Sequence, residues 1–186
     1  TVPVCPCSSF AATLSLCAST GFDQIACVLL WQPSQAMPLW PLLKRKRLKP
    51  FAGTIGLAPA EPGQHSIVPP RAVGGNMDIR DMAAGTELYL PVEVVGGLFS
   101  VGDTHACQGD GEVCGTAIES PCSVAAKFEL VKGANLAFPR FTTPGPVSRH
   151  LDVNGYEVTT GIGPDLMEGA KAAVSGMIDL LSRRYN

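Results

Sequence analysis

Glycine and proline interrupt this chain so often that few long regular elements fit between them. The 186 residues include 20 glycines and 16 prolines. The apolar stretches between them are mostly short, and several alternate apolar with polar side chains, which is typical of strands joined by turns. Apolar residues make up 46% of the chain and charged residues 16%, a balance that suits a well-buried core. The sequence therefore predicts a mainly β protein.

The composition also excludes several classes of function. The formal net charge is −2, so the charge balance gives no indication of a nucleic-acid partner. The apolar stretch at residues 10–31 contains Asp23 and Gln24 and follows no basic residue, so it predicts neither a membrane span nor a secretory signal. The seven cysteines are odd in number and none forms a C-x-x-C pair. These features favour a reduced, intracellular setting.

The chain changes in character near Lys49 and Pro50. Residues 1–49 hold four cysteines, both tryptophans and the basic run KRKRLK, without clean alternation or helical spacing. We expect this first part to be poorly ordered, and we interpret the basic run as a solvated surface rather than a phosphate-binding patch. Residues 50–186 are expected to form the folded region.

Short strands and a single helix are predicted within residues 50–186. The helix follows Gly163, because Pro164 suits its first position and Asp165 and Glu168 suit its first turn. We expect its apolar stripe to pack on the rest of the fold; the stripe is Leu166, Ala170, Ala173, Val174, Met177, Ile178 and Leu181. Four stretches are apolar or alternating and predict strands: 85–95, 97–103, 124–133 and 156–163. The predicted class is mainly β (α+β), with sandwich-like or barrel-like sheets and one packed C-terminal helix.

A first polar cluster lies in PPRAVGGNMDIRD, residues 69–81. Gly74 and Gly75 permit a tight turn that presents Asn76 and Asp78. These two residues are two apart and would face the same side of an extended segment. Taken alone, the pattern is explained better by an Asx turn that caps a loop than by a site.

A second and denser cluster lies in SVGDTHACQGDGEVCGTAIES, residues 100–120. Asp103 and His105 are two apart, so an extended backbone would point both the same way, and a carboxylate with an imidazole can hold a divalent metal. Glu112 and Glu119 flank VCGTAI, which is interpreted as a buried strand. Carboxylates there are costly unless they are paired or bind a metal. The cluster therefore predicts a site, although each member alone is equally compatible with a solvated loop.

Two further features have weaker signals. Cys114 could be a nucleophile, but its sequence neighbours are acidic, and a thiolate needs a base or a cation beside it. A buried structural role is therefore predicted for Cys114. The turn TTGIGPDL around Gly163 leads into a helix N-terminus, whose free N–H groups suit an anion or a developing oxyanion. An ordinary helix entry explains the same pattern.

Long stretches of the chain resemble the acetamidase/formamidase family. The motifs that carry the resemblance are GGNMD at 74–78, GDTHACQGDGEVCGTAIES at 102–120 and TTGIGPDLMEGAKAAVSGMIDLL at 159–181. The similarity extends from about Pro50 to the end of the chain. It implies a β-rich, cytoplasmic homo-oligomer that hydrolyses short aliphatic amides, formamide or acetamide, to ammonia and a carboxylate. Several members of the family are associated with a bound divalent metal.

The resemblance places the family's polar motif residues at Asn76, Asp78, Asp103, His105, Gln108, Asp110, Glu112 and Glu119. The resulting hypothesis is metal-assisted hydrolysis. Asp78, Asp103 and His105 are expected to hold a divalent ion, zinc or calcium, and Glu112 or Glu119 to act as general base. The residues expected to contact the amide substrate are Asn76, Gln108 and Gly163.

Residues 1–49 do not resemble the β-rich segment with which the family begins. We therefore expect a truncated chain, with a catalytic region at 50–186. Three alternatives remain: a covalent amidase that uses Cys114, a metal-binding module without turnover, and an inactive fragment.

Overall fold

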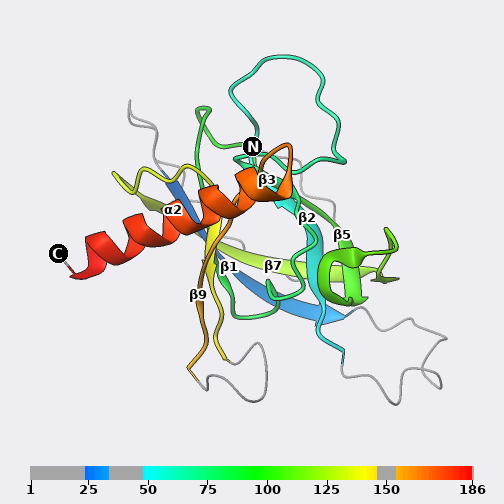
Figure 1. The fold of residues 1–186 in the computed structure, drawn as a ribbon. Coiled ribbons are helices and arrows are strands. Elements are labelled where there is room, and N and C mark those ends of the chain that lie inside the picture. Colours follow the sequence, from blue (N-terminus) through cyan, green and yellow to red (C-terminus); the bar gives the residue numbers. More distant parts are fainter. Residues whose placement is uncertain (1–23, 34–47, 146–153, 186) are drawn as a thin grey trace.

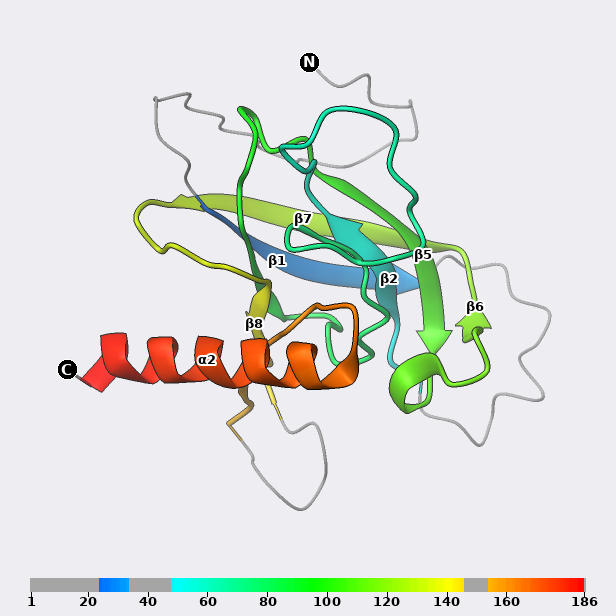
Figure 2. The same cartoon turned by 45° about the horizontal axis from the view of Figure 1, so that its top comes forward.

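The computed structural model of the chain describes residues 24–33, 48–145 and 154–185. In these ranges the chain forms nine strands in two antiparallel sheets, a short 3₁₀ turn and one long C-terminal helix (Figures 1 and 2). The mainly β class with one terminal helix is confirmed. No helix in the described ranges is long and apolar enough to cross a membrane.

The larger sheet has five strands in the order β7-β1-β4-β8-β9. The bounds are Cys122–Val131 for β7, Gln24–Pro33 for β1, Glu87–Leu90 for β4, Arg140–Thr142 for β8 and Glu157–Thr159 for β9. The predicted strand at 85–95 is shortened to four residues because Pro91, which has no N–H to donate, follows it directly.

The smaller sheet has four strands in the order β3-β2-β5-β6. Their bounds are Gly74–Asn76 for β3, Phe51–Gly56 for β2, Ser100–Cys107 for β5 and Ile118–Glu119 for β6. β2 lies between β3 and β5, and β6 pairs with the far end of β5. This sheet carries both polar clusters of the sequence, the first at β3 and the second at β5 and β6, on either side of β2.

The hydrophobic core joins the two sheets. Phe51 and Ile55 of β2, Leu88 and Leu90 of β4 and Phe141 of β8 belong to one buried cluster. Full burial of such side chains stabilises a fold by roughly 1.5–3 kcal/mol each. The core therefore fixes β2, and with it the end of the smaller sheet where the polar residues gather.

β1 differs from the expectation of a poorly ordered first part. Its ten residues pair along one edge with β7, from Gln24 opposite Val131 to Pro33 opposite Cys122, and along the other edge with β4. The partners that define β1 lie about 60 and 100 residues further along the chain, so the pattern within residues 24–33 does not reveal the pairing. Residues 1–23 and 34–47 lie outside the described residues.

The helix α2 (Leu166–Tyr185) packs on β9 with a face that the sequence does not single out. Gly161 and Gly169 approach so closely that a Cβ on Gly161 would lie 1.8 Å from the Gly169 carbonyl oxygen. The Thr159 hydroxyl donates to the Ala173 carbonyl at 2.8 Å, and Leu180 is buried. Small residues therefore let the helix approach the strand. The predicted packing of the apolar stripe is wrong, since most of its large side chains are exposed: Leu166, Val174, Ile178 and Leu181.

Candidate functional site

Four carboxylates and one imidazole converge at the end of the β2–β5–β6 sheet. They form two overlapping groups that share His105: Asp78, His105 and Glu112 in one, Asp103, His105 and Glu119 in the other. Within each group the oxygen and nitrogen atoms that could bind a metal lie within 4.8 Å of one another. The sequence predicts all five residues as site residues, and the fold brings all five together.

Strand pairing places His105 and Glu119 side by side. His105 lies opposite Phe51 of β2 and opposite Glu119 of β6. The imidazole is fully buried and makes an edge contact with the Phe51 ring, with 5.1 Å between the ring centroids. The His105 Nε2 atom lies 3.3 Å from Asp103 Oδ1 and 3.3 Å from Glu119 Oε2. Asp103 and His105 thus meet on one side of β5, as their spacing predicts.

Asp78 reaches the same place from the segment that follows β3. The backbone N–H groups of Met77 and Asp78 both donate to the Gly53 carbonyl, each at 3.1 Å. Two donors on one carbonyl hold this segment against the middle of β2. Asp78 itself is not extended, because its φ is 49°.

Three of the site carboxylates lie on left-handed backbone. Asp78 has a φ of 49°, Asp103 of 51° and Glu112 of 45°. Only two other non-glycine residues in the described ranges have a positive φ, namely Leu98 and Asn135. This conformation is uncommon for L-residues and costs on the order of 1–3 kcal/mol each. Its concentration at one site indicates that the backbone is bent to aim these carboxylates inward.

Gly53 forms the floor of the site. A Cβ at this position would lie 2.5 Å from Asp78 Oδ1, 2.7 Å from Asp103 Oδ2 and 2.8 Å from His105 Cε1. The absence of a side chain on β2 therefore leaves the space into which these groups point. Gly53 is not among the residues predicted from the sequence, because nothing in residues 51–56 distinguishes it from other strand glycines.

Burial and like charge both perturb the titration of Asp78. Burial first, then hydrogen bonding to Glu112 and the negative charges of Glu112 and Asp103, raise the pKa of Asp78 to about 6. His105 opposes this shift, but its effect is the smallest. Asp78 therefore holds its proton into the mildly acidic range.

The donor set fits a divalent cation. His105 Nε2 and Asp78 Oδ1 are both buried and form no hydrogen bond, although Nε2 lies 3.3 Å from two carboxylate oxygens. These oxygens are close enough to attract a proton but lie off the hydrogen-bond direction. Two ligands at 2.0–2.1 Å from a tetrahedral zinc ion are themselves about 3.3 Å apart. The orphaned atoms and their spacing are therefore those of a metal site.

Four other predicted residues lie outside this group of five. Asn76 accepts the Thr54 hydroxyl at 2.7 Å. Asp110 forms an ion pair with Arg80 at 2.9 Å, and the Asp110 side chain is 82% exposed. A Cβ on Gly163 would meet the first turn of α2. Gln108 contacts His105 and the Asp78 backbone.

The predicted strand VCGTAI is wrong over most of its length. The 3₁₀ turn η1 (Asp110–Glu112) and a further turn precede β6, and strand pairing begins only at Ile118. Val113 is 93% exposed and Cys114 is exposed too, so a buried role for Cys114 is also wrong. The glycines at 111 and 115, both at a φ of 70°, turn the chain where a strand would have to continue.

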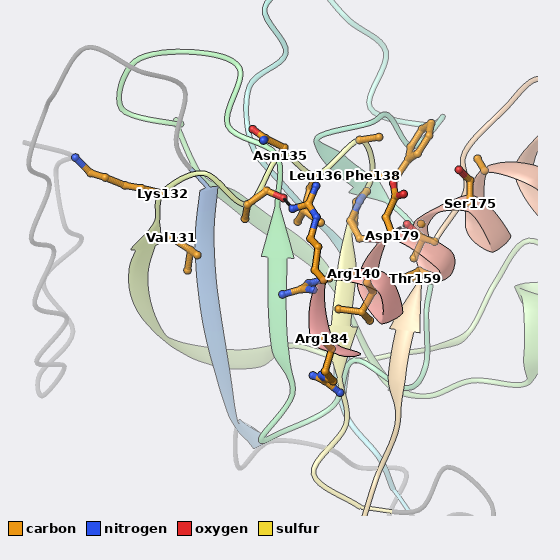
Figure 3. A pocket seen from close by; sticks show the side chains of 18 residues that line it. Val131, Lys132, Asn135, Leu136, Phe138, Arg140, Thr159, Ser175, Asp179 and Arg184 are labelled. Atoms are coloured by element: carbon orange, nitrogen blue, oxygen red, sulfur yellow. Dashed lines mark hydrogen bonds between the residues drawn. The ribbon is translucent and has the colours of Figure 1, made fainter. Parts of the chain in front are cut away.

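A larger hollow of about 490 Å³ lies elsewhere, between α2 and the loop that joins β7 to β8 (Figure 3). Asp179 is its one carboxylate, and no histidine or cysteine lines it. Two of its arginines already have partners: Arg184 pairs with Glu157 at 2.6 Å, and Arg140 lies over the Tyr89 ring at 4.4 Å. A single carboxylate without an imidazole or thiolate beside it does not make a metal-ligand cluster. The candidate site is therefore the acidic cluster.

Known proteins resemble this chain in both sequence and fold. The family model described as Acetamidase/Formamidase family matches residues 56–186. The chain belongs to the acetamidase/formamidase family. The match includes all five residues of the cluster.

Individual relatives are similar over parts of their length. The acetamidase of Mycolicibacterium smegmatis is 37% identical over 114 residues, which are 60% of this chain and 27% of that enzyme. The formamidase of Methylophilus methylotrophus is 48% identical over 67 residues, 35% of this chain and 16% of the enzyme. The crystal structure of the Bacillus halodurans acetamidase superposes with a TM-score of 0.70 at 26% identity, covering 87% of this chain and 61% of that one. The matched regions thus span 27% and 16% of these two curated relatives and 61% of the solved structure.

Proposed function

We propose that this chain carries an amide-hydrolysing site that acts on short aliphatic amides, formamide or acetamide, with a divalent metal ion. The observation that supports this most is the convergence of four carboxylates and the buried His105 imidazole on the space above Gly53. Membership of the acetamidase/formamidase family supports the class of substrate. The cytoplasmic location and the homo-oligomer belong to the same proposal.

His105, Asp103 and Glu119 are the residues proposed to hold the ion, with Asp78 Oδ1 facing the same space. An imidazole among the donors favours zinc, whereas calcium prefers oxygen ligands throughout. Zinc is therefore the first metal to test and calcium the second. When bound, such an ion supplies Lewis acidity toward an amide carbonyl and lowers the pKa of a bound water. This assignment moves Glu119 from the list of possible bases to the list of ligands.

Glu112 is the residue proposed as general base. Its carboxylate lies within 4.8 Å of the Asp78 and His105 ligand atoms, so a water molecule that fills the space between these groups would be within its reach. In the proposed reaction, Glu112 removes a proton from water as the water oxygen attacks the amide carbon. The same proton then passes to the amide nitrogen, which leaves as ammonia when the carbon–nitrogen bond breaks. The products are ammonia and the carboxylic acid.

The direct test is ammonia release from formamide and acetamide by the purified chain. We expect release that stops on chelation and returns with zinc or calcium. His105→Ala is expected to abolish release, because it removes the one nitrogen donor of the cluster. His65→Ala is the matched control, since His65 contacts the Glu61 carbonyl and has no place in the cluster.

The alternatives give different results in the same assay. Release that survives chelation but is blocked by a thiol alkylator would replace this proposal with the covalent route through Cys114. Tight metal binding without release from either amide would indicate a metal-binding module. Folded protein with neither property would be an inactive fragment.

A further inference from the structure

Gln108 contacts the His105 nitrogen Nδ1, whereas the Asp103 and Glu119 carboxylates lie beside Nε2. Its Oε1 atom lies 2.9 Å from His105 Nδ1. Its Nε2 atom donates to the Asp78 backbone carbonyl at 2.6 Å. The side chain therefore connects the imidazole to the segment that carries Asp78, and both of its polar ends have partners within the protein.

These two contacts determine where the imidazole carries its proton. A backbone carbonyl can only accept a hydrogen bond, so the Gln108 NH₂ group must face the Asp78 carbonyl. The amide oxygen of Gln108 is then left to face His105, and it too can only accept. His105 must consequently donate from Nδ1, and in the neutral ring Nε2 is the bare nitrogen.

We propose that Gln108 is a positioning residue of the site: its amide fixes the His105 ring with the proton on Nδ1, so that the Nε2 lone pair faces the carboxylates. Without Gln108, the Asp103 and Glu119 oxygens, 3.3 Å from Nε2, would draw the proton to that nitrogen. A protonated Nε2 cannot bind a metal. The role is distinct from contact with substrate, which the family resemblance suggests for Gln108.

The choice of a neutral amide follows from the charge of the site. A carboxylate often orients a metal-binding histidine, but here four carboxylates already surround the ring. A glutamate at position 108 would add a fifth and would face the Asp78 carbonyl with another acceptor. Glutamine supplies the same acceptor to Nδ1 and donates to that carbonyl without adding charge.

The test reads the proton position directly from ¹⁵N NMR of the imidazole nitrogens in the metal-free chain, above the usual histidine pKa of about 6.5. His105 is expected to carry its proton on Nδ1. His65 provides an internal reference, because its Nε2 atom lies 2.7 Å from the Glu61 carbonyl and must donate to it. The two rings should therefore show opposite tautomers in one spectrum. A His105 proton on Nε2 in the wild-type chain would overturn the proposal.

Gln108→Met removes both hydrogen bonds and keeps the length of the side chain. The His105 proton should then move to Nε2, and zinc affinity measured by calorimetry should fall about 10- to 100-fold. Gln64→Met, at an exposed position, should change neither. Unchanged tautomer and affinity in Gln108→Met would refute a positioning role.

Gln108→Glu is a second variant, which keeps the proposal testable if Gln108→Met does not fold. The glutamate keeps an acceptor for His105 Nδ1, so the wild-type tautomer is expected even though the hydrogen bond to the Asp78 carbonyl is lost. A His105 proton on Nε2 in the Gln108→Glu variant would count against the proposal. The inference rests on the proposed metal site, but the two fail separately. A wild-type chain with the expected tautomer and no zinc binding would refute the metal site and leave the action of Gln108 on His105 intact.

Discussion

Gly53→Ala is the change that most directly tests whether the space above β2 is the working part of the site. It adds one methyl group and no charge. The new Cβ would lie 2.5 Å from Asp78 Oδ1, 2.7 Å from Asp103 Oδ2 and 2.8 Å from His105 Cε1. Ordinary contacts of a Cβ begin near 3.4 Å, so all three groups would have to move apart.

The size of the expected effect follows from these distances. Each group must retreat by roughly 0.6–0.9 Å, whereas metal–ligand distances tolerate only about 0.2 Å. Zinc affinity should therefore fall by at least about 100-fold, in line with the 10- to 100-fold loss typical of disturbing ligand support alone. Overpacking of this kind costs about 1–3 kcal/mol of folding free energy, of which the better strand propensity of alanine recovers about 0.5–1 kcal/mol.

The assay is zinc titration by calorimetry together with urea unfolding of the metal-free chain. Gly102→Ala is the matched control, because Gly102 lies on the neighbouring strand β5 and a Cβ there would meet nothing within 4 Å. Gly102→Ala should bind zinc like the wild type. If Gly53→Ala also binds zinc with wild-type affinity, the metal does not occupy the space above Gly53 and the proposed site is refuted.

Three further changes test other parts of the structure. The pKa of Asp78 is raised from 3.8 to about 6, so the folded metal-free chain binds this proton more tightly than the unfolded chain does. The resulting stabilisation of the fold is complete below pH 3.8 and is lost as the pH rises through 6. Asp78→Asn should therefore flatten the fall in urea stability across that range and stabilise the metal-free chain at pH 7 by about 1–2 kcal/mol, with solvent screening allowed for; a wild-type pH profile would contradict this. Iodoacetamide should modify the exposed Cys114 without slowing ammonia release, whereas inactivation that Cys114→Ser resists would establish the covalent route. Asp165→Ala should cost about 1 kcal/mol in urea unfolding, because Asp165 Oδ1 accepts the N–H groups of Met167 and Glu168 at 2.9 Å each, and Asp165→Asn should retain most of that stability.

The sequence predicts those elements whose formation depends on neighbouring residues in the chain. The strand at 124–133 and the helix after Gly163 both follow from periodicity and end signals, and the structure has them at Cys122–Val131 and Leu166–Tyr185. Asp103 and His105 meet as their spacing of two predicts, although Asp103 has a φ of 51° and the strand is therefore not regular there. These predictions need no knowledge of what packs where.

Long-range pairing decides the parts that the sequence does not reveal. β1 is a strand because β7 and β4 bind both of its edges. α2 presents small residues to β9 because the main chains approach closely at Gly161 and Gly169, so a stripe of larger apolar residues gives the wrong face. Gly53 acquires its role only when β2 lies beside β5 and below Asp78. These three features have the same physical cause: the deciding contact joins two separate elements of the fold.

The site combines three local costs that a fold optimised only for stability would avoid. Three carboxylates occupy left-handed backbone, like charges crowd one another, and a ring nitrogen is buried without a partner. Such costs persist only where surrounding contacts impose them, and here the Gly53 carbonyl, the β2–β5–β6 pairing and Gln108 do so. A bound cation would offset the charge and satisfy the nitrogen, and binding to the folded form stabilises it by about 2.7 kcal/mol at a hundredfold excess over Kd. Zinc should therefore stabilise the wild-type chain against urea. It should leave the urea stability of Gly53→Ala unchanged, because the added Cβ, which crowds Asp78, Asp103 and His105, also prevents the ion from binding.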